Sequence, residues 1–206
     1  GHEDGTLGEW TSSGGGRVYT IGSGTASVST DFAHSGNRSA KLSITKASGT
    51  AQNAQIYRWA ESATQPSAYY STWYYFPKRY SGISWWNVMQ WESKLSSGPA
   101  PLWILNVGNR ADGSMYLYLW DKAKGQFYGQ SAANLPVGRW FQVETYYKQA
   151  SDGTGQVTVW QDGNQILNAS GVNTRRAGDM IQWAVGNYTD RISPSNANIY
   201  VDDAAI

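Results

Sequence analysis

Residues 83–94 read Ile83-Ser84-Trp85-Trp86-Asn87-Val88-Met89-Gln90-Trp91-Glu92-Ser93-Lys94, a stretch with the composition of a β-strand that has two different faces. Because side chains alternate across a strand, Trp85, Met89 and Trp91 are predicted to pack into a core. The opposite face would carry Trp86, Val88, Gln90, Glu92 and Lys94. That row sets an indole ring beside amide, carboxylate and ammonium groups, which together suit the ring faces and hydroxyls of a sugar.

The polar row also has a simpler explanation, an outer sheet face without a ligand. Burying such groups without partners costs about 1–3 kcal/mol each, so the row is expected to face either solvent or a ligand. The composition favours a ligand. The 206 residues include 11 Trp and 14 Tyr, more aromatic surface than a core of this size requires, and part of it is expected to be exposed.

The rest of the chain has the composition of an all-β protein. Short aromatic and β-branched runs, such as 69–76, 102–107, 115–120, 141–148 and 181–188, alternate with turns rich in Gly, Asn, Asp and Ser. The content of 23 Gly and 15 % charged residues is typical of a sandwich or barrel. No repeat or linker interrupts the pattern, so one domain over residues 1–206 is predicted.

Several functional classes are disfavoured by composition. The chain has no cysteine, which excludes disulfides and thiolate metal sites. The net charge of +1, without a basic run, argues against nucleic-acid binding and membrane-surface binding. No apolar segment is long enough to cross a bilayer, so a mature soluble domain or an excised module is expected. The two histidines, His2 and His34, lie in the opening and in a turn, which disfavours a His-based triad or metal cluster.

Two further predicted strands repeat the two-faced pattern. Residues 115–120 alternate Met and Leu with Tyr116, Tyr118 and Trp120, and residues 141–148 alternate core residues with polar ones. The predicted glycan-binding residues are Trp86, Gln90, Glu92, Lys94, Tyr116, Tyr118, Trp120, Gln142, Glu144, Tyr146 and Lys148.

Glu92 and Glu144 are the carboxylates on strongly patterned strands. If the two strands face each other across a groove, the pair can act as acid and as base or nucleophile in glycoside hydrolysis, which needs about 5–9.5 Å between the carboxyl groups. Each can equally accept hydrogen bonds from sugar hydroxyls, or pair with Lys94 or Lys148.

Acidic residues lie near both ends of the chain. Glu3 is close to the start, and Asp202 and Asp203 are close to the end. In a closed sandwich the termini often meet, and their carboxylates with turn carbonyls would form an oxygen site suited to a structural Ca²⁺. The alternative is a pair of solvated acidic ends.

Several motifs resemble carbohydrate-active jelly rolls. The opening Glu3–Trp10, the segment His34–Leu42 and the closing Ile199–Ile206 are similar to the framework of carbohydrate-binding jelly-roll modules, whose ends share a calcium ion. The segments Gln90-Trp91, Leu135–Trp140, Gly155–Gly163 and Gly186–Tyr188 resemble the heparin-lyase-I-like polysaccharide lyases. The resemblance implies a concanavalin A-like jelly-roll β-sandwich of two antiparallel sheets with a concave glycan-binding groove, in a secreted protein.

The chain departs from the lyase pattern at the groove strand. The lyases that it resembles carry Gln-x-His there, whereas this chain has Gln90-Trp91-Glu92. Elimination from a uronate also requires its carboxylate to be neutralised, for which the predicted groove strands offer Gln90, Gln142 and lysines. A tyrosine such as Tyr146 can act as both base and acid.

These features predict a protein that holds a polysaccharide, with a β-glycan of plant cell walls as the first expectation. The first hypothesis is a non-catalytic binding module, alone or within a larger carbohydrate-active enzyme. The second is a polysaccharide lyase or glycoside hydrolase of the same fold, with Glu92, Glu144 and Tyr146 as its catalytic residues. The third is a structural or adhesion domain whose aromatic residues are buried.

Overall fold

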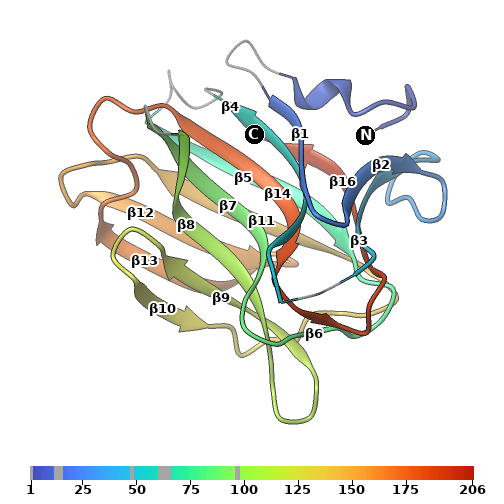
Figure 1. The fold of residues 1–206 in the computed structure, drawn as a ribbon. Helices are drawn as coiled ribbons and strands as arrows, with labels where there is room; N and C mark the ends of the chain where they lie inside the picture. The colour runs from blue at the N-terminus through green and yellow to red at the C-terminus, as the bar shows by residue number, and fades with distance from the viewer. Residues whose placement is uncertain (1, 12–15, 47–48, 60–65, 96–97) are drawn as a thin grey trace.

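A computed structural model describes residues 2–11, 16–46, 49–59, 66–95 and 98–206, and it shows two seven-stranded antiparallel sheets facing each other (Figure 1). Sheet A has the order β1 (Gly16–Ile21), β4 (Gln52–Trp59), β14 (Ile181–Thr189), β7 (Trp86–Leu95), β8 (Gly98–Asn109), β9 (Met115–Asp121) and β10 (Gln126–Gln130). Sheet B has the order β13 (Asn164–Val172), β12 (Gly155–Gln161), β11 (Trp140–Lys148), β5 (Ser67–Tyr75), β16 (Ala197–Ala205), β3 (Ser39–Ile44) and β2 (Gly24–Ser29).

The remaining elements are short. The strands β6 (Ser81–Gly82) and β15 (Ile192–Ser193) pair with each other, and a 3₁₀ turn, η1, covers Gly8–Trp10. The all-β jelly-roll prediction is confirmed. The strands β6, β10 and β15 were not expected from the sequence, because each is short or lacks a clear alternation. No helix among the described residues is long and apolar enough to cross a membrane.

The core lies between the two sheets and is rich in aromatic rings. Trp91 of β7 stacks on Tyr147 of β11 at 4.7 Å between ring centroids, and Tyr70 of β5 meets the edge of Trp91 at 5.6 Å. Each is at most 1 % exposed, and burying a large apolar side chain stabilises a fold by roughly 1.5–3 kcal/mol. These contacts join β7 at the centre of sheet A to β11 and β5 at the centre of sheet B.

The turn between β12 and β13 follows directly from its sequence. Asp162 and Gly163 have φ values of 50° and 77°, the left-handed conformation that a two-residue hairpin of type I′ requires at both positions. Gly163 adopts it without a Cβ penalty, and Asp tolerates it better than most residues. An Asp-Gly dipeptide between two strands favours such a hairpin, and here it forms one.

A β-bulge in β7 reverses the predicted faces of its first residues. The pairing of β7 with both neighbours shifts between Asn87 and Met89. An extra residue at a bulge interrupts the alternation of side chains. As a result, Trp86 points into the core with 0 % exposure and contacts Phe76 at 5.6 Å, while Trp85 stays partly exposed.

The prediction that Trp86 is an exposed sugar platform is therefore wrong. Its indole Nε1 donates a hydrogen bond to the side-chain oxygen of Asn187 at 2.9 Å inside the sandwich. Val88, predicted on the same outer row, is also buried in the core. Beyond the bulge the alternation is as predicted, because Met89 and Trp91 are core residues and Gln90 and Glu92 belong to the opposite face.

Candidate functional site

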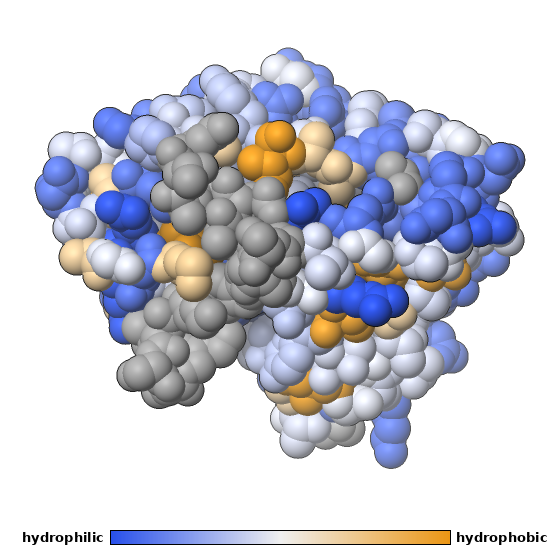
Figure 2. Space-filling view, turned by 90° about the horizontal axis from the view of Figure 1, so that it is seen from above, coloured by the Kyte–Doolittle hydropathy of each residue, from blue (hydrophilic) through white to orange (hydrophobic). Residues whose placement is uncertain are grey.

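A groove lies across the outer face of sheet A. Two depressions form it, of about 400 Å³ and 440 Å³, and both are lined by Tyr188 of β14 and Pro101 of β8. One depression lies over β1, β4, β14 and β7, and the other lies over β7, β8, β9 and β10. Because they share two lining residues, they lie next to each other. Seen from above, the molecule shows mainly hydrophilic and intermediate residues with small, separate hydrophobic patches among the described atoms (Figure 2).

The first depression has a polar floor built by alternation on three neighbouring strands. Its polar lining consists of Asn53 and Gln55 on β4, Gln90 and Glu92 on β7, and Gln182 on β14. All five residues are buried, with 0–8 % of their surface exposed. Gly186 of β14 makes room for this set, because a Cβ there would lie 2.7 Å from the Cγ of Gln55.

Two of these amides have unused hydrogen-bonding capacity. Asn53 Nδ2 donates to Gln55 Oε1 at 3.0 Å, and Gln90 Nε2 donates to Glu92 Oε1 at 2.5 Å. The side-chain oxygens of Asn53 and Gln90 are buried without a partner among the described residues. A buried polar atom left in this state costs about 1–3 kcal/mol. The floor therefore contains two acceptor oxygens that the described residues leave unsatisfied.

Glu92 is the one carboxylate among the described residues that line the two depressions. Burial raises its pKa from 4.5 to about 7, against the opposing effect of the hydrogen bond from Gln90. Desolvation disfavours the charged form of a carboxyl group, which explains the direction of the pKa shift. At neutral pH Glu92 is therefore divided between its protonated and ionised forms, the range in which a general acid or base works best.

Tyr188 links the two halves of the groove. Its ring meets Trp85 edge-on at 4.7 Å, and burial is the main cause that raises the pKa of its phenol, with smaller contributions from Tyr19 and Glu92. Glu92 and Tyr188 both line the first depression, so one bound substrate can contact both groups. A phenol with a raised pKa keeps its proton at neutral pH and can donate it.

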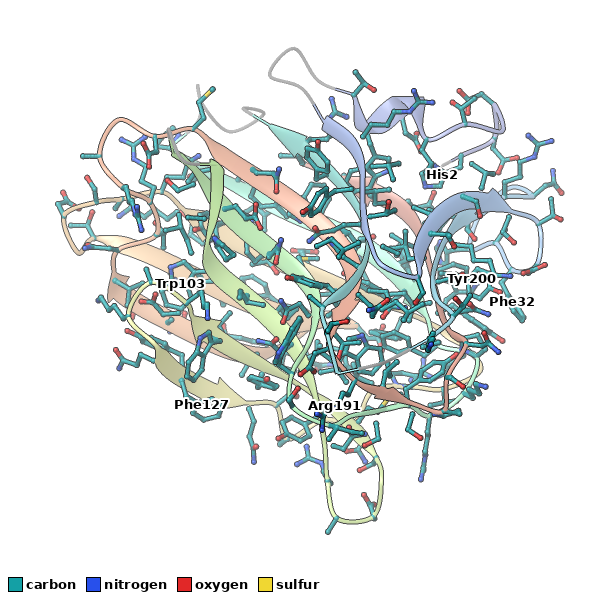
Figure 3. The ribbon with its side chains drawn as sticks, in the orientation of Figure 1. His2, Phe32, Trp103, Phe127, Arg191 and Tyr200 are labelled. Atoms are coloured by element: carbon teal, nitrogen blue, oxygen red, sulfur yellow. The ribbon has the colours of Figure 1, made fainter. Side chains whose placement is uncertain are left out.

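The second depression is aromatic. Trp85, Tyr118, Trp120 and Phe127 line it together with Tyr188, and Tyr118 lies 6.1 Å from Phe127 between ring centroids. Phe127 is 52 % exposed and lies on β10, at the outer end of sheet A (Figure 3). Lys122, an exposed residue, adds a positive charge at this end. Ring faces beside a cation are suited to binding successive sugar units of an acidic chain.

The structure places part of the predicted set in this groove. Gln90, Glu92, Tyr118 and Trp120 line it. Tyr116 lies on the same face of β9, outside the lining, with the Arg110 guanidinium 4.6 Å from its ring centroid. The side chain of Lys94 lies outside the described residues.

Four residues of the predicted set belong to a different surface. Gln142, Glu144, Tyr146 and Lys148 lie on β11, which pairs with β5 and β12 in sheet B, and they face away from the core. The sandwich therefore separates Glu144 from Glu92, and the hypothesis that they face each other across one groove is wrong. Tyr146 is likewise excluded as the acid and base of the sheet A groove.

Sequence reasoning missed several residues of the groove. Asn53, Gln55 and Tyr57 alternate with core residues on β4, and Gln182 and Tyr188 lie on the outer face of β14. The alternation of Asn53, Gln55 and Tyr57 with Ala54 and Ile56 was visible in the sequence. What the sequence could not show is that β4 and β14 lie beside β7.

The acidic residues at the chain ends meet one loop, residues 34–38. Glu3 Oε1 accepts hydrogen bonds from the backbone N–H groups of Asn37 and Arg38, at 3.0 and 2.9 Å. Asp202 Oδ2 accepts one from the N–H of His34 at 2.9 Å, and Asp203 contacts His34 Nδ1 at 2.7 Å. Asp202 and Glu3 thus bring the two ends of the chain to the same loop, as a shared Ca²⁺ would require.

The residues at the two chain ends supply only part of a Ca²⁺ site. The described residues contain no group of three or more His, Cys, Asp or Glu side chains arranged to hold a metal. A calcium site there would use Glu3 and Asp202 with backbone carbonyls of the loop, since Ca²⁺ accepts mixed oxygen ligands. The carboxylate oxygens are engaged by N–H donors, which offers a metal-free explanation for the same contacts.

Comparisons with known proteins agree with this fold. The endo-β-1,4-glucuronan lyase from the fungus Trichoderma reesei matches with a TM-score of 0.74 and 16 % identity, over 98 % of this chain and 92 % of that one. The alginate lyase vAL-1 from Chlorella virus matches with a TM-score of 0.60 and 14 % identity, over 95 % of each chain. The alginate lyase from Aplysia kurodai has a TM-score of 0.55 and 16 % identity, over 87 % of this chain and 85 % of that one.

At these identities the likeness concerns the fold. No curated protein sequence matches the chain. A family described as polysaccharide lyase matches residues 2–205, nearly the whole sequence. The chain therefore belongs to the polysaccharide lyase family.

Proposed function

We propose that this protein is a lyase that cleaves a uronate-containing polysaccharide by β-elimination in the groove of sheet A. The observation that carries the proposal is the groove floor, where Glu92, two amides with unused capacity and Tyr188 lie together. Family membership supports the enzyme hypothesis over the non-catalytic module that the sequence placed first. The named structures with the same fold act on glucuronan and alginate, which are polymers of uronic acids.

The side-chain amides of the groove floor bind the carboxylate of the substrate. Each side-chain NH₂ group has two hydrogens, and Asn53 and Gln90 each use one in the bonds described above. Both residues line the depression, and we assign the second N–H of each to the uronate carboxylate. Donors at that position stabilise the negative charge that spreads onto the carboxylate when the neighbouring C5 loses its proton.

Glu92 and Tyr188 carry out the two proton transfers of the elimination. Ionised Glu92 takes the proton from C5, the C4–O bond to the leaving sugar breaks, and a C4=C5 double bond forms. Tyr188 donates its phenolic proton to the leaving oxygen, and solvent then returns a proton from Glu92 to Tyr188. The environments of these two groups suit the roles, because one has a pKa of about 7 and the other keeps its proton at neutral pH.

Hydrolysis with a pair of carboxylates is disfavoured by the lining of the groove. That mechanism requires a second carboxyl group at about 5–9.5 Å. The described lining residues include no second carboxylate, and Glu144 lies on the other sheet. A binding-only role remains the second candidate, favoured by the aromatic half of the groove.

A panel of soluble polysaccharides tests the proposal. The protein should release products with unsaturated uronate ends, detected by their ultraviolet absorbance, from polyglucuronate, polymannuronate or polyguluronate, and none from neutral glucans. Tyr188→Phe should lower kcat by about 10²–10⁴-fold, the usual contribution of a positioned acid or base. Tyr116→Phe is the matched control, since Tyr116 is on the same sheet face but outside the lining. Binding of a polyuronate without any product would favour the binding module.

The location of the protein is part of the same proposal. Polysaccharides of this kind lie outside cells, so we expect the enzyme to be secreted.

A further inference from the structure

The outer face of sheet B, on the opposite side of the sandwich from the groove, carries a cluster of aromatic rings that the proposed elimination does not use. Tyr69 of β5, Tyr146 of β11 and Trp160 of β12 come from three adjacent strands. The ring of Tyr69 lies 5.1 Å from that of Tyr146 and 6.1 Å from that of Trp160. Tyr69 is 56 % exposed, and the other two are partly exposed.

Strand register places the rings in one surface. Tyr146 is directly opposite Tyr69, and Glu144 is directly opposite Trp160. None of the three rings belongs to the buried core of the sandwich. The three rings therefore contribute little to the stability of the fold. A cluster of exposed rings on a soluble protein is typical of a binding surface.

Polar groups with sugar-binding chemistry surround the rings. Glu144 lies between Trp160 on one neighbouring strand and Ser71 on the other, and no ion pair of Glu144 occurs among the described residues. Gln142 Nε2 donates to Ser71 Oγ at 2.9 Å, which fixes that amide beside the rings. Thr158 Oγ1 donates to Asn168 Oδ1 at 2.7 Å on the same face. Ring faces and hydrogen-bonding groups thus alternate across the strands.

We propose that this face is a second glycan-binding surface that takes a neutral polysaccharide, with the pyranose rings lying on Tyr69, Tyr146 and Trp160. The charges of the face decide the class of polymer. Glu144 beside the rings would repel the carboxylates of a uronate chain, while it can accept hydrogen bonds from neutral sugar hydroxyls. The one cation of β11, Lys148, balances Glu144 and leaves the strand face without net charge. The enzyme can then be held on a neutral glycan while its groove acts on an acidic one.

Retention on insoluble cellulose and mobility shifts in gels containing hydroxyethylcellulose test this surface. The wild-type protein should be retained on cellulose and slowed in the gel. Tyr69→Ala and Trp160→Ala should each weaken binding at least roughly ten-fold, by analogy with the stacking of nucleobases on aromatic side chains. Tyr19→Ala is the matched control, because Tyr19 is 52 % exposed but belongs to sheet A, and it should be retained like the wild type. Circular dichroism checks that each variant is folded.

The test of this second surface can fail without the elimination proposal failing, and the reverse also holds. Turnover of a short uronate oligosaccharide should be unchanged in Tyr69→Ala and Trp160→Ala, while Glu92→Gln should lose turnover and keep its retention on cellulose. Absence of retention by the wild type on both neutral polymers would overturn the inference. It would also be overturned if the folded Tyr69→Ala and Trp160→Ala variants bound as well as the wild type, or if they lost affinity for a polyuronate instead.

Discussion

Glu92 lies on the groove floor with only 8 % of its surface exposed, and its burial has consequences for stability as well as for chemistry. Since its pKa is raised from 4.5 to about 7, the native state holds this proton more tightly than the unfolded state. The associated stabilisation is complete below about pH 4.5 and is lost as the pH rises to about 7. One pKa unit corresponds to about 1.4 kcal/mol, so the ionised group costs the native state about 3 kcal/mol.

The variant Glu92→Gln removes this titration while keeping a polar side chain of the same shape. Its free energy of unfolding relative to the wild type should therefore increase by about 3 kcal/mol between roughly pH 4.5 and pH 8. Urea denaturation at the two pH values measures the difference. Glu144→Gln, on the outer face of sheet B, serves as the control for the chemical change itself. An equal pH response of the wild type and Glu92→Gln would mean that burial does not raise the pKa of Glu92.

The pH dependence of turnover decides which form of Glu92 works. As the base, Glu92 must be ionised, so kcat/KM should rise with pH and level off above about 7. Steady-state rates on a polyuronate between about pH 5 and pH 9 provide the measurement. A rate that falls through the same range would show instead that protonated Glu92 donates a hydrogen bond to the substrate carboxylate.

Some groove residues could be predicted from the sequence and others could not. Gln90 and Glu92 alternate regularly with Met89 and Trp91, and that local pattern identified them. Asn53 and Tyr188 come from β4 and β14, which reach the groove only through sheet pairing with distant parts of the chain. No local periodicity contains that information.

At the scale of a single strand, the bulge in β7 decides which tryptophan is structural. A strict period of two put Trp85 in the core and Trp86 on the groove face, whereas the shift between Asn87 and Met89 exchanges them. Bulges depend on how a strand fits both neighbours, so the sequence of one strand does not show them.

The exchange predicts opposite effects for two adjacent substitutions. Trp86→Ala should destabilise the fold by about 3–5 kcal/mol, the usual cost of truncating a buried aromatic residue. It also leaves the side-chain oxygen of Asn187 without its indole donor. Trp85→Ala, the matched control, should cost much less stability and mainly weaken substrate binding, because Trp85 lines the groove. Chemical denaturation of both variants checks this, and a larger loss of stability in Trp85→Ala would contradict the bulge.

For the molecule as a whole, the sequence predicted the layers better than it predicted the assignment of strands to sheets. Alternation identified the core faces of β9 and β11 correctly. It did not show that β11 joins sheet B, and this one assignment separates Glu144 and Tyr146 from Glu92. The order of strands in a sheet is set by pairings between distant segments, as in β16 with β3 and β5.

The closing of the sandwich at the chain ends gives a further prediction. If Glu3 and Asp202 share a Ca²⁺ at the loop of residues 34–38, a chelator should lower the unfolding temperature, and Ca²⁺ should restore it better than Mg²⁺. An ion at 100 times its dissociation constant stabilises the native state by about 2.7 kcal/mol. Calorimetry with and without chelator measures this. An unchanged unfolding temperature in protein shown to be metal-free would leave the N–H contacts of Glu3 and Asp202 as the sole link.

The central claim is that the sheet A groove breaks a uronate polymer by elimination, and the mass of the products tests it most directly. Elimination adds no water, so the summed masses of the two fragments from a defined polyuronate oligosaccharide should equal the mass of the starting chain. The fragment with the new non-reducing end should carry the double bond, and Glu92→Gln should form neither fragment. Fragments heavier in sum by one water molecule would show hydrolysis and contradict the account.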